Sequence, residues 1–151
     1  MEIKSFFEAQ IERNKQLIID SNLSEYKVWA RKYLELHTKI SDLADETRCY
    51  KYWVGEDIEI DKETLFKKYL DCFGTILSIG IDKDYNSIEE IAIKPNDYCL
   101  SDQFLNLFID INDLIISTSE DHYITLIEDF LSLGITLGYS KNQISESFLN
   151  N

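Results

Sequence analysis

Two stretches of the chain place a lysine and an aspartate three residues apart, as Lys39-x-x-Asp42 and Lys68-x-x-Asp71. In a helix, residues at this spacing lie one turn apart on the same side. Carboxylates can hold a hard cation such as Mg²⁺, whereas an ammonium group pairs with carboxylates or binds anions. If the two helices pack together, each lysine can pair with the aspartate of the other helix.

Apolar stripes beside these pairs predict the two helices that position them. Apolar residues recur at steps of three and four in both stretches, which is typical of an amphipathic helix. The first stripe contains Trp29, Tyr33, Leu36, Ile40, Leu43 and Thr47, and the second contains Phe66, Leu70, Phe73, Leu77 and Gly80. A polar stripe with Glu35, Lys39, Asp42 and Glu46 borders the first. Packing of the two apolar stripes would bring the two Lys/Asp pairs close together.

Capping signals predict the ends of these and four further helices. The expected helices are residues 3–21, a long one from Ser24 to about Tyr52, one that begins at Asp61 or Thr64, one from Ser101 to about Ser117, one from Ser119 to Leu137 closed by Gly138, and a short last one from Ser140 or Asn142. Residues 82–97 are predicted to form a polar turn followed by a short strand-like or helical segment. This pattern predicts an all-α protein in one domain, residues 1–151.

Composition excludes several classes of partner. The formal net charge is −13, with no basic stripe to neutralise the phosphates of a nucleic acid or an anionic membrane surface. The longest apolar run, Phe73 to Ile81, is too short to cross a bilayer. Three cysteines without CxxC spacing indicate reduced, buried thiols. These features predict a cytoplasmic protein that binds neither nucleic acid nor membrane.

Several segments together resemble a known family. They are Leu43-Ala44-Asp45-Glu46-Thr47-Arg48, Tyr50-Lys51-Tyr52-Trp53, Tyr69-Leu70-Asp71-Cys72 and Leu77-Ser78-Ile79-Gly80. They resemble the dimeric all-α dUTPases, which belong with the MazG-like proteins to the all-α nucleotide pyrophosphohydrolases. The resemblance covers most of the chain. It implies a helical bundle of the all-α NTP pyrophosphatase type, a homodimer and a nucleotide ligand.

The family's metal ligands do not carry over. The family places ExxE on one helix and ExxD on the next, and these carboxylates hold Mg²⁺ against the substrate's phosphates. The matching positions here are Lys39, Asp42, Lys68 and Asp71. A lysine with an ordinary pKa of about 10.4 keeps its proton and cannot be a metal ligand. We therefore predict no metal cofactor, with the lysines standing where the metals stood.

Two further departures indicate a degenerate hydrolase. Gly74 stands where the family has a histidine, and the sequence reaches Asn151 before the family's terminal segment that holds phosphates and base would be complete. A rearranged ligand set of Asp42, Asp45, Glu46 and Asp71 is the alternative that would keep Mg²⁺. In that case the protein would be an active dUTP or dUDP pyrophosphatase, with a metal-activated water as nucleophile.

The remaining candidate residues concern nucleotide binding. The resemblance places Gln10 in the base pocket, and the alternative is a solvent-exposed helix residue. Arg48, Lys51 and Trp53 match the family's R-x-x-K-x-W and could bind a phosphate and stack a base. Alternatively, Trp53 packs in the core or a dimer interface, and the cations interact with a helix C-terminus. The predicted binding set is Gln10, Lys39, Asp42, Arg48, Lys51, Trp53, Lys68 and Asp71.

Three hypotheses of function follow. The first is a protein that has lost efficient Mg²⁺-dependent hydrolysis and binds a nucleotide or a nucleotide-derived signal, with Lys39 and Lys68 as phosphate partners. Because members of the family are carried by phages and mobile elements, the resemblance extends this hypothesis to a regulatory or counter-defence role. The second is the active pyrophosphatase, and the third is a protein-interaction scaffold in which Lys39–Asp71 and Lys68–Asp42 are structural pairs.

Overall fold

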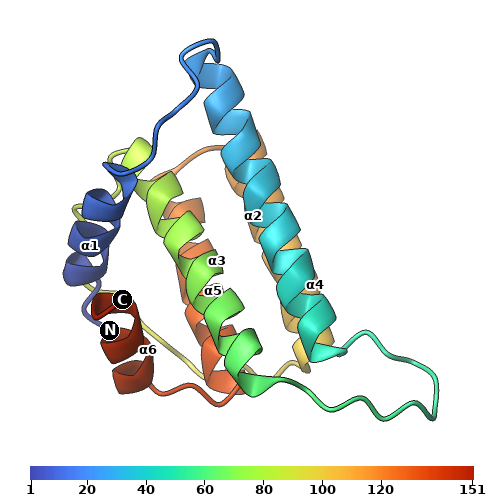
Figure 1. The fold of residues 1–151 in the computed structure, drawn as a ribbon. Coiled ribbons are helices and arrows are strands. Elements are labelled where there is room, and N and C mark those ends of the chain that lie inside the picture. The colour runs from blue at the N-terminus through green and yellow to red at the C-terminus, as the bar shows by residue number, and fades with distance from the viewer.

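Six α-helices and no named strands make up the computed structural model, which describes all 151 residues (Figure 1). The helices are α1 (Lys4–Asn14), α2 (Glu25–Thr47), α3 (Lys62–Asp82), α4 (Leu100–Ile116), α5 (Glu120–Thr136) and α6 (Lys141–Leu149). The predicted all-α fold class is therefore confirmed. None of the six helices is both long and apolar enough to cross a membrane.

The long helices α2, α3, α4 and α5 form a bundle in which α2 packs on α3 and α4, and α5 packs on α3 and α4. The short helix α1 lies against α3 and α6, on the side of α3 away from α4, and both chain ends lie there (Figure 1). Residues 48–61, between α2 and α3, project from the body as a long loop. This arrangement exposes one face of α2 and α3 beside α1.

Side-chain caps fix four of the helix starts, because each accepts hydrogen bonds from backbone N–H groups that have no partner inside the helix. Ser24 caps α2, Asp61 caps α3, Ser119 caps α5 and Ser140 caps α6. All four were candidates from the sequence. The predicted cap Ser101 is wrong: the N-cap of α4 is Cys99, two residues earlier, and its side chain makes no capping hydrogen bond.

Two predicted helix ends are also wrong. The first helix ends at Asn14 rather than residue 21, and the apolar residues Leu17, Ile18 and Ile19 that follow are exposed. The long helix ends at Thr47 rather than near residue 52. There the Thr47 hydroxyl binds the Ala44 carbonyl and the Cys49 N–H, and Arg48 takes a left-handed φ of 56°.

A short extended contact joins the chain start to residues 88–91. Glu2 and Glu90 form an isolated antiparallel bridge, and Ile3 N–H donates to the Glu89 carbonyl at 2.8 Å. The side chains of Ile88 and Ile91 are buried. Of the two alternatives for this segment, the strand-like one is therefore closer to the structure.

The core consists of 28 buried apolar side chains. In α2 the predicted stripe is buried apart from Trp29, which is half-buried. In α3 the buried side is rotated relative to the prediction, because Phe66 and Leu70 are only half-buried while Tyr69 is fully buried. Cys72 is buried as predicted, but Cys49 is half-buried and Cys99 is exposed.

Close helix packing depends on Gly80 of α3. A Cβ atom at Gly80 would lie 2.1 Å from the Tyr123 hydroxyl oxygen, so only glycine allows the Tyr123 ring this close. The Tyr123 hydroxyl donates to the Ile76 carbonyl of α3 at 2.9 Å. This contact fixes α5 against α3, and α3 in turn carries Lys68 and Asp71 of the charged residues described next.

Candidate functional site

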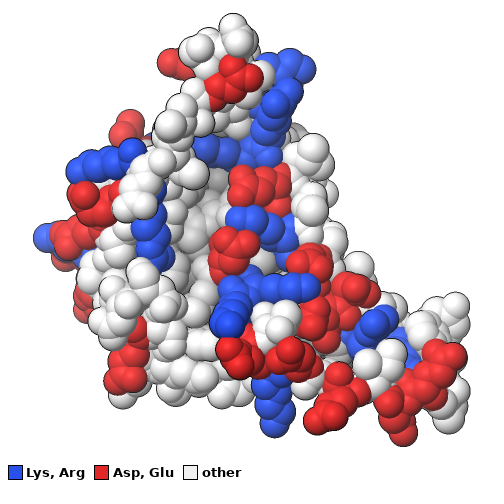
Figure 2. Space-filling model, in the orientation of Figure 1, with Lys and Arg blue, Asp and Glu red and all other residues white.

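The two predicted Lys/Asp pairs meet across the interface of α2 and α3. Lys39 Nζ lies 3.0 Å from Asp71 Oδ1, and Lys68 Nζ lies 3.0 Å from Asp42 Oδ1. The expected cross-pairing of the two helices is therefore confirmed. Figure 2 shows positive and negative side chains alternating along this face of the molecule.

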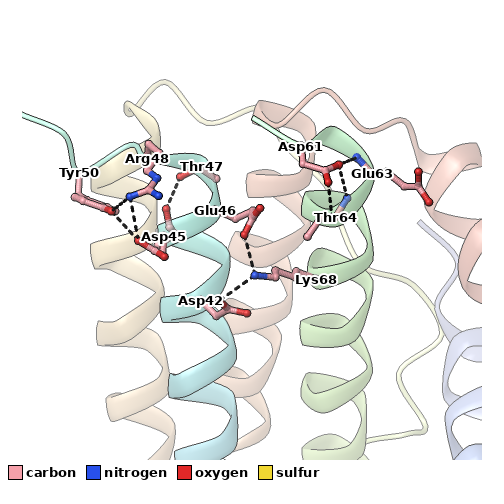
Figure 3. Close-up of polar contacts among 11 residues, drawn as sticks. Asp42, Asp45, Glu46, Thr47, Arg48, Tyr50, Asp61, Glu63, Thr64 and Lys68 are labelled. Atoms are coloured by element: carbon pink, nitrogen blue, oxygen red, sulfur yellow. Dashed lines mark hydrogen bonds and ion pairs between the residues drawn. The ribbon is translucent and has the colours of Figure 1, made fainter. Parts of the chain in front are cut away.

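Each lysine also contacts a glutamate of α2 whose role the sequence reasoning missed. Lys39 Nζ lies 2.8 Å from Glu35 Oε1, and Lys68 Nζ lies 2.8 Å from Glu46 Oε2. In Figure 3 the Lys68 ammonium group lies between Asp42 and Glu46. The signal was present in the sequence, because each glutamate lies four residues from Lys39 or Asp42 on one side of the helix. We call these six side chains the lysine–carboxylate cluster: Glu35, Lys39, Asp42, Glu46, Lys68 and Asp71.

The cluster keeps both lysines protonated. Burial disfavours the ammonium form of Lys39, but hydrogen bonds to Glu35 and Asp71 outweigh it and raise the pKa of Lys39 above its ordinary value. Lys39 also donates to the Thr75 hydroxyl at 3.0 Å. Hydrogen bonds to Glu46 and Asp42 likewise raise the pKa of Lys68. Two protonated amines therefore occupy the centre of the cluster at neutral pH.

This arrangement does not fit the Mg²⁺ ions of the family. No group of three or more histidine, cysteine, aspartate or glutamate side chains is arranged to hold a metal ion. Asp45 of the alternative ligand set turns away from the cluster, because it accepts a hydrogen bond from the Tyr50 hydroxyl at 2.6 Å and pairs with Arg48 (Figure 3). The other carboxylates of that set, Asp42, Glu46 and Asp71, contact ammonium groups.

A cleft of about 430 Å³ borders the cluster, between α1, α2, α3 and the C-terminal end of the chain. From the cluster it includes Glu35, Lys39 and Asp71. Its polar lining also includes residues that sequence reasoning did not single out: Arg13, Asn14, Lys32, Thr75 and Ser78. Because clefts of a few hundred Å³ are typical of small-molecule sites, this one is large enough for a nucleoside or nucleotide.

Gln10 of α1 forms one wall of this cleft. Its side-chain N–H group donates to Asn14 Oδ1 at 2.8 Å and to Ser78 Oγ at 3.2 Å. Its carbonyl oxygen faces Gly74, where an added Cβ atom would lie only 3.0 Å away. Gln10 is therefore a half-buried cleft residue rather than a solvent-exposed one. A histidine at position 74 would displace it.

Arg48, Lys51 and Trp53 lie elsewhere. They line a separate hollow of about 240 Å³ in the loop after α2, together with Glu56, Asp57 and Ile58. Arg48 donates to the Tyr50 hydroxyl at 3.0 Å, and Lys51 donates to the Gly55 carbonyl. Trp53 is 42% exposed and packs edge-on against Tyr52, so the core alternative for this residue is wrong. The structure thus divides the predicted binding set into two places.

Arg13 was not predicted, although it lies one turn from Gln10. Its guanidinium group lies 4.2 Å from the centre of the Phe148 ring and donates to the main-chain oxygens of Phe148 and Asn151. It makes no ion pair with an acidic side chain, unlike Lys32, which pairs with Asp82 at 2.6 Å. Arg13 is therefore the cleft cation that acidic side chains leave uncompensated.

The all-helical bundle and the positions on α2 and α3 that face each other define a protein of the all-α dUTPase class. The family model described as dUTPase matches residues 2–151, and the chain belongs to this family. No match was found among the curated proteins or among the solved structures.

Proposed function

We propose that this dUTPase-family protein binds a nucleoside or nucleotide ligand in the cleft between α1, α2 and α3 and does not hydrolyse it with Mg²⁺. The observation that carries the proposal is the contact of Lys39 and Lys68 with two carboxylates each, at 2.8–3.0 Å. Two of these carboxylates, Asp42 and Asp71, stand at the family's ligand positions, and the lysines occupy the other two. Metal-assisted hydrolysis needs oxygen ligands for the cation at these positions. Protonated amines in that place supply neither a Lewis acid nor an activated water.

The groups that line the cleft support the proposal that the protein still binds a nucleoside or nucleotide. Its amide and hydroxyl groups, on Gln10, Asn14 and Ser78, form one hydrogen-bonded group beside the cluster. The Gln10 carbonyl accepts no hydrogen bond within the protein, so it can accept one from a base or sugar.

We also propose that the protein is a homodimer. Leu34 of α2 and Leu105 of α4 are more than half exposed. Each lies one turn from a member of the stacked ring pair His37–Phe108, which joins the two helices. Exposed apolar side chains on two packed helices are typical of an interface between protein chains. Light scattering should then give twice the 17.7 kDa of one chain, whereas a monomeric mass would contradict this part of the proposal.

Exposed apolar side chains also support the scaffold hypothesis as a second candidate. The loop between α2 and α3 also exposes Tyr52 and Val54, which are almost fully accessible. If the protein binds no nucleoside or nucleotide, these apolar side chains are the surface through which a protein partner would bind.

The test is to incubate the purified protein with dUTP and Mg²⁺ or Mn²⁺ and to measure nucleotide products, together with binding in the presence and absence of the metal. We expect no product and the same affinity in both conditions. A ligand that binds only the native state raises its stability by RT ln(1 + [L]/Kd), so thermal shift gives an independent readout. Metal-dependent release of dUMP would overturn the proposal and restore the active pyrophosphatase.

A further inference from the structure

The lysine–carboxylate cluster carries a negative net charge. Two ammonium groups face four carboxylates, Glu35, Asp42, Glu46 and Asp71, which leaves two negative charges uncompensated. Each ammonium group already contacts two carboxylates at hydrogen-bond distance. The lysines therefore have little attraction left for phosphate, contrary to the role that the sequence suggested for them.

The rest of the cleft offers one further positive charge. Lys32 is neutralised by Asp82 at 2.6 Å, so Arg13 is the cleft cation with no acidic side-chain partner. Its present hydrogen-bond partners are main-chain oxygens, which a ligand oxygen can replace. The chain as a whole has a formal charge of −13, which adds to the repulsion of a highly charged anion.

We propose that the cleft binds a nucleoside or a nucleoside monophosphate, and that each additional phosphate weakens binding. This inference rests on the proposed function and specifies its ligand class. A triphosphate brings about four negative charges and, without a metal, meets a cluster of the same sign. A single phosphate can be met by the guanidinium group of Arg13, while the base and sugar contact the amide groups of Gln10 and Asn14.

The experiment is isothermal titration calorimetry of the full chain with deoxyuridine, dUMP, dUDP and dUTP, without divalent cations, and with the same series on the other common bases. We expect the triphosphate to bind at least about tenfold more weakly than the monophosphate, which corresponds to about 1.4 kcal/mol. The difference should shrink as salt is added, because salt screens repulsion between exposed charges.

A charge-matched pair of variants tests the cause. Glu35→Gln with Asp71→Asn frees Lys39 at the cleft wall and removes two negative charges. Glu12→Gln with Glu63→Gln removes two negative charges from exposed ion pairs outside the cleft, those of Lys15 and Lys67. We expect the first variant to reduce the preference for monophosphate over triphosphate by about tenfold and the second to leave it within about twofold.

The outcomes separate the two proposals. If dUTP or another triphosphate binds most tightly without metal and is not hydrolysed, this inference is overturned while the proposed function stands. If both charge variants change the preference equally, the cluster is not its cause and the inference is again overturned. Binding of no member of any series would overturn the proposed function and, with it, the inference.

Discussion

Carboxylates meet at two helix interfaces of this molecule and are neutralised in different ways. Between α2 and α3 the lysine–carboxylate cluster uses two ammonium groups, and its aspartates are more than half exposed. Between α4 and α5, Asp110 and Asp129 lie together without a cation. The Asn106 amide donates to Asp129 at 2.9 Å and to Asp110 at 3.4 Å. Burial, with the hydrogen bond and charge of Asp129, raises the pKa of Asp110 to about 8.

The difference concerns what holds each interface together. Between α4 and α5 a proton keeps the pair of the buried Asp110 and the half-buried Asp129 from carrying two negative charges, so pH is the relevant variable. Between α2 and α3 the ammonium groups of Lys39 and Lys68 balance the carboxylate charge instead. The contribution of this interface to the free energy of unfolding is therefore independent of pH near neutrality. Because Lys39 and Lys68 have raised pKa values, their contribution is fully present below about pH 10 and is lost only as pH rises further. The α2–α3 interface also borders the cleft that contains Gln10, which is the proposed ligand site.

The largest effect should come from Lys39→Glu combined with Lys68→Glu, which removes both cations and leaves six carboxylates. We expect a loss of roughly 2–4 kcal/mol in the free energy of unfolding, because the remaining charges repel one another without a partner. Mg²⁺ or Mn²⁺ should restore part of it if the family's ligand geometry persists, since carboxylate oxygens then surround the cation. Urea unfolding with and without metal measures both effects.

Lys39→Gln combined with Lys68→Gln is the control for that variant. It removes the same cations but adds no carboxylate, so metal should stabilise it much less. Equal rescue of both variants by Mg²⁺ would show that the metal binds elsewhere. No rescue of the glutamate variant would show that the backbone no longer presents the family's metal geometry.

The sequence was sufficient to predict the elements for which the apolar periodicity and the local capping chemistry agree. The stripe of α2, the caps Ser24, Ser119 and Ser140, and the cross-pairing of the lysines all follow from spacing, because residues three and four apart share a helix face. The end of α1 was missed because Leu17, Ile18 and Ile19 continue an apolar pattern yet find no core to pack against. Apolar pattern alone cannot reveal whether a neighbouring element will cover it.

Contacts between helices that are far apart in the sequence could not be predicted from it, for a different reason. Spacing within α4 cannot reveal that Asp110 faces Asp129, because this depends on the rotation of α4 against α5. The same holds for Arg13 and the end of the chain, and for the division of the predicted binding set between the cleft and the loop after α2. A resemblance assigned Arg48, Lys51 and Trp53 to the site by motif, whereas their contacts lie within the loop.

The next effect concerns pH and the α4–α5 pair. Asp110 keeps its proton up to about pH 8 in the native state but ionises near pH 4 in the unfolded chain, so the native protein loses stability as pH rises from about 4 to 8. Asp110→Asn supplies a permanent donor to Asp129 and should flatten this slope. We expect a gain of about 1–2 kcal/mol at pH 8 and almost none at pH 4, measured by urea unfolding across that range.

Asp113→Asn is the matched control, because it removes one charge from an exposed position of the same helix, and that charge makes only the smallest contribution to the raised pKa of Asp110. It should leave most of the pH slope in place. If the two variants flatten the slope equally, general charge repulsion rather than the buried pair causes it, and the contrast between the two interfaces loses its basis.

A smaller effect is expected from a single lysine of the cluster. Lys39→Met keeps the apolar stem but removes the contacts with Glu35, Asp71 and Thr75. The loss should be about 1 kcal/mol, because both carboxylates are at least half exposed and regain water. A loss above about 3 kcal/mol would mean that the pair behaves as buried, as at the α4–α5 interface.

The smallest effect is expected at an ion pair of the same chemistry that lies outside the cluster. Lys67 neighbours Lys68 on α3 and contacts Glu63 at 2.7 Å, but both side chains are more than 70% exposed. Lys67→Met should leave the urea midpoint unchanged, because exposed pairs gain little over their hydrated, separate state. If Lys67→Met instead destabilises the protein as much as Lys39→Met, distance alone sets the strength of these pairs. The position of the cluster between two packed helices would then add nothing to the stability that its ion pairs contribute. The cluster and the Asp110–Asp129 pair would differ only in how exposed their side chains are.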